Sequence, residues 1–122
     1  MGLARQIMGG GFSAGQAKAL AGSVASAVSA AGTVITDATD LTASINIVTT
    51  WAAGAGVQLP SMDVGDEVEV LNVGAGAGYV YPESATVQIN GLPVGTGFVL
   101  STSTGVKVRK VTTTRCIGYL SA

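Results

Sequence analysis

The chain has 122 residues, enough for one domain, and 48% of them are apolar while only 11% are charged. It contains no histidine and a single cysteine, which disfavours a general base that titrates near neutrality, an activated thiol and a His/Cys metal cluster. A net charge of −1 argues against nucleic acid as a partner. We therefore predict no enzymatic activity, no catalytic, cofactor-binding or metal-binding residues, and no cofactor.

Residues 1–31 differ in composition from the rest of the chain and are expected to form an N-terminal arm, extended or partly helical. The spacing of Leu20, Val24 and Val28 by four would place them on one helical stripe. The alternative is a flexible tail, although such tails usually carry more charge and proline. Large apolar residues are too few here for a membrane span or a secretory signal, so we expect no membrane association.

From residue 32 the pattern becomes that of β-strands, and residues 32–122 are expected to form one all-β domain. The clearest strand covers residues 66–73, where Val68 and Val70 point to one face and Glu67 and Glu69 to the other. Further short strands are expected at 33–36, 44–51, 57–59, 79–81, 86–90, 98–101, 106–111 and 117–120. About eight short strands at this spacing are typical of a small antiparallel β-sandwich or barrel.

Two hairpins are predicted within this domain. One joins residues 66–73 to residues 79–81 through a glycine-rich connection, and the other joins residues 98–101 to residues 106–111. The connection Gly74-Ala75-Gly76-Ala77-Gly78 lacks the G-x-G-x-x-G spacing and leads into a strand rather than a helix, so we interpret it as a turn and not as a phosphate-binding loop.

Two features could suggest a chemical site, but each has a simpler interpretation. The acids Asp63, Asp66, Glu67 and Glu69 lack the regular ligand spacing of a calcium loop, so we expect them to be exposed strand and turn residues. Cys116 lies in an apolar run, and no histidine exists to activate it. It is expected to be a small buried apolar side chain.

The best candidate for a binding segment is the basic run Lys107, Arg109, Lys110 and Arg115. On a strand, Lys107 and Arg109 share a face with Val111, while Lys110 points to the opposite face. One interpretation is a solvated edge strand, on which lysines discourage aggregation. The other is contact with an acidic neighbour in an assembly. No aromatic residues are interleaved with these bases, which again argues against nucleic acid.

The apolar content exceeds what one small core can hide, which predicts that the chain associates with copies of itself. The apolar candidates for the core of such an oligomer are Trp51, Tyr79, Tyr81 and Phe98. The sequence does not separate them from ordinary core residues.

The segment 37–91 contains an ordered succession of short motifs. They read VTT-x-AAG-x-G-V-x-LP, then GD-x-V-x-V-x-N-x-GA, then VYP and ING. This succession resembles a module of virion proteins of tailed bacteriophages, found in small capsid-decorating (cement or head-fibre) proteins and in tail-associated ones. The resemblance implies an all-β module, commonly trimeric, that is attached to the phage particle.

On this resemblance the chain is expected to be a capsid decoration protein that trimerises and stabilises the assembled head. Its partners would be copies of itself and the major capsid protein, and its location the virion surface after synthesis in the host cytoplasm. The alternative is a tail or neck component, such as an adaptor or fibre-base module. A carbohydrate-binding module or enzyme has less support, since glycan sites usually show exposed Trp or Tyr. An intracellular β domain with another partner is the remaining interpretation.

Overall fold

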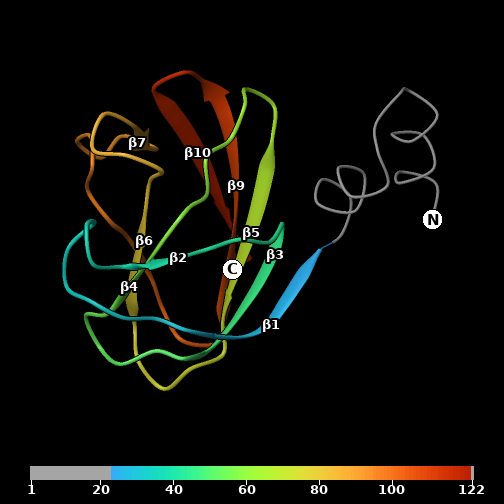
Figure 1. The fold of residues 1–122 in the computed structure, drawn as a ribbon, viewed down its shortest axis with the longest axis vertical. Helices are drawn as coiled ribbons and strands as arrows, with labels where there is room; N and C mark the ends of the chain where they lie inside the picture. The colour runs from blue at the N-terminus through green and yellow to red at the C-terminus, as the bar shows by residue number, and fades with distance from the viewer. Residues whose placement is uncertain (1–22, 122) are drawn as a thin grey trace.

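The computed structural model describes residues 23–121, which form ten β-strands in two sheets and no helix (Figure 1). The six-stranded sheet contains, in spatial order, β1 (Val24–Ser29), β3 (Ile45–Thr50), β5 (Glu67–Asn72), β9 (Thr104–Thr112), β10 (Arg115–Leu120) and β7 (Gln88–Ile89). The four-stranded sheet contains β2 (Thr39–Asp40), β4 (Gly56–Gln58), β6 (Gly78–Tyr81) and β8 (Phe98–Leu100). The prediction of an all-β chain is confirmed.

From β1 to β6 the chain alternates between the two sheets, with one strand in each. β3 pairs in parallel with β1 and β5 with β3, while β4 pairs in parallel with β2 and β6 with β4. Each coil therefore lies on the coil before it, and the chain resembles a short β-solenoid. β8 and β9 then pair antiparallel with β6 and β5, which ends the parallel winding.

The expected antiparallel β-sandwich or barrel of about eight strands is therefore wrong in strand pairing and in winding. Alternating apolar residues define the two faces of a strand, but they do not define the direction of its neighbour. Parallel strands need a long crossover, and here each crossover is a strand of the other sheet. Both predicted hairpins are wrong for the same reason, because β5 and β6, like β8 and β9, lie in different sheets.

Small residues form the corners at which the coils pass from one sheet to the other. The loop after β5 lies on the loop after β3, where Gly76 N donates to Trp51 O (2.9 Å) and Gly54 N donates to Ala77 O (3.1 Å). A Cβ on Gly78 would overlap the Trp51 side chain. The close approach of two backbones thus requires glycine at this corner, which explains the Ala/Gly-rich loops.

The core lies between the two sheets, and valine is its commonest residue. Trp51 is 1% exposed, and its Nε1 donates to Ala55 O at 2.8 Å. Two buried asparagines are tied to backbone: Asn72 donates to Gly76 O and Leu100 O, and Asn46 donates to Ala43 O. The apolar residues buried with Trp51 include Val48, Val57, Val70, Val80, Ile89, Leu100, Val106 and Val108.

The start of the described chain bears on the predicted arm, residues 1–31. Residues 1–22 of that segment lie outside the described residues, as does Leu20 of the expected helical stripe. Val24 and Val28 belong to β1, which pairs with β3, so a helix through these two residues is wrong. A six-residue strand already precedes residue 32, at which the β domain was expected to begin.

Candidate interaction surface

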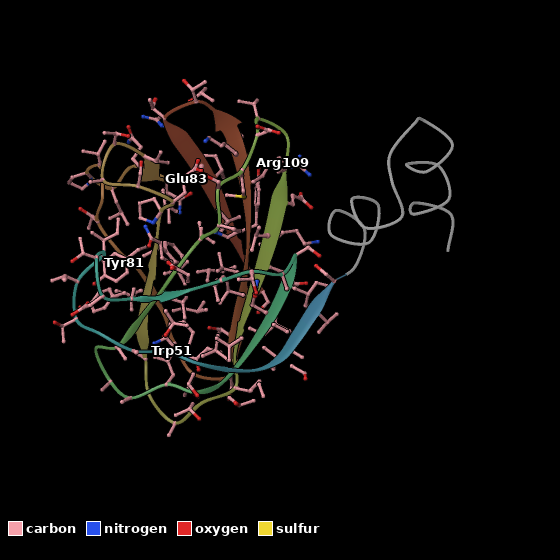
Figure 2. The ribbon with its side chains drawn as sticks, viewed as in Figure 1. Trp51, Tyr81, Glu83 and Arg109 are labelled. Atoms are coloured by element: carbon pink, nitrogen blue, oxygen red, sulfur yellow. The ribbon has the colours of Figure 1, made fainter. Side chains whose placement is uncertain are left out.

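Four charged side chains lie together at the centre of the outward-facing side of the six-stranded sheet, which we call the outer face. Glu67 and Glu69 project from β5, and Arg109 and Lys107 lie directly opposite them on β9. Arg109 Nε donates to Glu67 Oε2 at 2.9 Å, and the two side chains form an exposed ion pair. Arg109 is labelled in Figure 2. β9 is a central strand rather than the solvated edge strand that one interpretation of the basic run required.

Apolar side chains flank these charges on the outer face. Tyr119 on β10 is 53% exposed and Val24 on β1 is 54% exposed, while the others are partly exposed. The partly exposed residues are Ile45, Ile47, Leu71 and Ile117. An open depression of about 440 Å³ lies on this face, lined by the four charged residues together with Gly105, Tyr119, Leu120 and Ser121. This face can therefore offer another protein both ion pairs and apolar contacts.

The third base of β9, Lys110, points into the protein, as the strand alternation predicts. It forms an ion pair with Glu83, and the two side chains are only 10% and 9% exposed. Glu83 Oε2 also accepts a hydrogen bond from Met62 N at 2.9 Å. Lys110 therefore anchors the loop after β6 to β9 and is not available to a partner. Its partner Glu83 is labelled in Figure 2.

Glu83, whose side chain is largely buried, was not singled out from the sequence. Burial alone would raise the pKa of its carboxyl, but the hydrogen bonds from Lys110 and Met62 N and the positive charge of Lys110 outweigh burial, and the pKa is lowered. The sequence feature that could have indicated a buried carboxylate such as Glu83 is Lys110. It alternates with the core residues Val106 and Val108, and a buried lysine requires a carboxylate nearby.

The remaining candidate residues have local structural roles. Asp66 Oδ2 accepts a hydrogen bond from Asp63 N at 2.9 Å within a turn. Cys116 is buried, as predicted. The pKa of its thiol is raised, mainly by burial and to a lesser extent by the negative charge of Glu83. Arg115 is exposed at the start of β10, next to Gln88 of β7. Within residues 23–121, there is no group of three or more Asp, Glu or Cys side chains placed to hold a metal ion.

The four aromatic candidates for an oligomer core lie in different surroundings. Trp51 and Tyr81 are buried in their own chain, and Tyr81 Oη donates to Thr33 O at 3.2 Å, so these two belong to the ordinary core and not to an oligomer core. Phe98 packs partly against the core. Tyr79 is 37% exposed, and its ring lies 6.0 Å from that of Tyr81 on the four-stranded sheet.

The chain matches no protein-family model, no curated protein and no solved structure. Over the described range, 23–121, no helix has the length and apolar character needed to cross a bilayer. The motif succession in segment 37–91 covers the strands from β2 to β7.

Proposed function

We propose that this chain is a structural protein of a bacteriophage virion, of the capsid decoration type, which associates with copies of itself and stabilises the assembled head. The observation that carries the proposal is the outer face. This face offers a partner a row of charges of both signs with apolar side chains beside them, so a protein surface of complementary charge can bind it. The resemblance of segment 37–91 supplies the phage particle as the place of assembly and implies a trimer.

The physical role would be thermodynamic rather than catalytic. A protein that binds the assembled shell but not its dissociated subunits stabilises the shell by mass action. An oligomer presents several copies of each contact, so weak individual contacts combine into strong attachment.

The test is cosedimentation of the purified full chain with heads assembled from the major capsid protein of the same phage. We expect saturable binding and an increase in the temperature at which the heads dissociate. We further propose that the N-terminal arm contacts the shell. Deletion of residues 2–22, which leaves β1 in place, is therefore expected to abolish head binding. Failure of the full chain to bind the heads would refute the proposed function.

The runner-up, a tail or fibre-base module, is favoured by one observation. β1 and β2 are edge strands at the start of the parallel winding, and an edge of this kind can be continued by another coil. A module of that type would be present in few copies per particle, whereas a decoration protein is present in hundreds.

A further inference from the structure

The charges of the outer face are arranged symmetrically about the middle of the six-stranded sheet. β5 and β9 are the third and fourth of the six strands, so the middle of the sheet runs between them. The two acids, Glu67 and Glu69, lie on one side of this line, and the two bases, Arg109 and Lys107, lie directly opposite on the other side. The centre of the face is therefore acidic on one half and basic on the other.

The flanking apolar residues follow the same arrangement. Ile45 on β3 is in register with Glu69, and Tyr119 on β10 is in register with Lys107. One row across the face therefore reads Ile45, Glu69, Lys107, Tyr119. A rotation of 180° about the middle line exchanges the acidic half of this row with its basic half and one apolar end with the other.

We propose that the outer face binds the outer face of a second copy of this chain, across a twofold axis that runs along the strands between β5 and β9. In this pairing Glu69 faces Lys107 of the second copy, Glu67 faces Arg109, and Ile45 faces Tyr119. Each contact occurs twice, as in any isologous interface. The inference rests on the self-association part of the proposed function and deepens it by naming the surface that associates.

Within the described residues, two of the four charged side chains on this face, Glu69 and Lys107, form no ion pair with each other and can pair with charges of a second copy. Arg109 and Glu67 already form an ion pair within one copy. Glu69 and Lys107 are partners in the strand register, yet among residues 23–121 no hydrogen bond or ion pair joins their side chains. A second copy would supply each of them with an opposite charge, and because one face carries both signs, no other protein is needed for complementarity.

The size of the face is sufficient for a specific contact. Six strands about 4.8 Å apart, which average about six residues in length, at about 3.3 Å per residue, form a face of about 24 Å by 20 Å. Two such faces together cover about 1,000 Å², which is near the lower limit of specific protein interfaces. We therefore expect a reversible pairing that depends on concentration and salt, rather than an obligate dimer.

The first test is sedimentation velocity of the full chain over a range of micromolar concentrations. A twofold contact predicts even-numbered species, either a dimer or, if another surface forms the trimer, a hexamer. Lys107→Glu and Glu69→Lys should each weaken the association at least about tenfold, because each change puts like charges together at two symmetric positions. The exchange of both charges in one chain should restore it.

The matched control is Val99→Lys. Val99 is 56% exposed on β8 of the other sheet, so this change adds a charge to an exposed strand away from the outer face and should leave association unchanged. Circular dichroism of every variant separates loss of association from loss of folding. A wild-type chain that remains monomeric or forms only odd-numbered species, or a Lys107→Glu chain that associates like the wild type, would overturn the inference.

A second measurement tests the geometry itself. Chains carrying Ile45→Cys are mixed with chains carrying Tyr119→Cys and treated with a short bismaleimide; the native Cys116 is buried and should not react. Cross-links should join the two kinds of chain. Like pairs should form poorly, because they are offset by three strand spacings, about 14 Å along the face. If cross-links form only between two chains that carry Ile45→Cys or between two chains that carry Tyr119→Cys, the twofold pairing is wrong. A chain that binds heads but stays monomeric would overturn this interface and leave the proposed virion role standing.

Discussion

The buried pair of Glu83 and Lys110 gives the sharpest prediction about stability. At an effective dielectric constant of about 20, opposite charges in contact attract by about 4 to 5 kcal/mol, but the desolvation of each ion costs several kcal/mol. The intact pair is therefore close to neutral for stability. Removal of one partner leaves the other charge buried, and this typically costs about 3 to 5 kcal/mol.

We expect Glu83→Gln to destabilise the chain by about 3 kcal/mol at neutral pH, because Lys110 then lacks its counter-ion. For a domain of this size such a loss lowers the melting temperature by about 10 to 20 °C. Lys110→Met should cost a similar amount, and the double variant should cost less than the sum of the two. Urea denaturation at constant pH measures all three values.

The pH dependence of this effect has a definite sign. The pKa of Glu83 is lowered in the folded state, so its stabilising contribution is present above the ordinary value of 4.5 and is lost as the pH falls through the lowered value. The difference between the wild type and Glu83→Gln should therefore shrink at acid pH. The control is Glu67→Gln, whose partner Arg109 is half exposed, and its cost should be about 0.5 kcal/mol or less. A loss for Glu83→Gln as small as that of the control, or additivity in the double variant, would refute the reasoning.

Three further predictions concern the coil corners and the core. Gly78→Ala should lower the free energy of unfolding, measured by urea denaturation, by about 1 to 3 kcal/mol, because the added Cβ would overlap the Trp51 side chain. In the control Gly91→Ala the added Cβ meets no atom within 4 Å, and the loss should be less than about 1 kcal/mol. Asn72→Ala removes hydrogen bonds to two carbonyl oxygens at a fully buried position, and a loss of about 3 kcal/mol is expected by the same assay. Cys116 should resist maleimide labelling in the folded chain at neutral pH and react after unfolding, as mass spectrometry can show; rapid labelling under native conditions would contradict its burial.

The sequence predicted the strands better than their arrangement. The alternation of Val68 and Val70 with Glu67 and Glu69 correctly gave the two faces of β5, and the same reasoning placed Lys110 opposite Lys107 and Arg109. Side-chain alternation is a local property, so it is readable without knowledge of the fold. Strand direction and sheet membership depend on where the chain goes at each corner, and a short glycine-rich connection is compatible with both a hairpin and a corner.

One signal of the solenoid winding was present in the sequence. Successive coils place Ala31 against Gly56, and Trp51 and Ala53 against the glycines from 74 to 78, so small residues recur after β1, β3 and β5. No internal repeat was predicted, because the strands between these corners share little beyond apolar alternation. The partner of Lys110 was equally hidden, since Glu83 follows β6 in the other sheet and nothing in the local pattern connects them.

The proposed virion role is tested most directly by the amount of this chain in purified virions, measured against the major capsid protein by quantitative mass spectrometry. A decoration protein that covers the head should be present in hundreds of copies per particle, in a fixed ratio to the capsid subunit. Absence of the chain from purified particles, or the presence of only a few copies, would contradict a capsid decoration role.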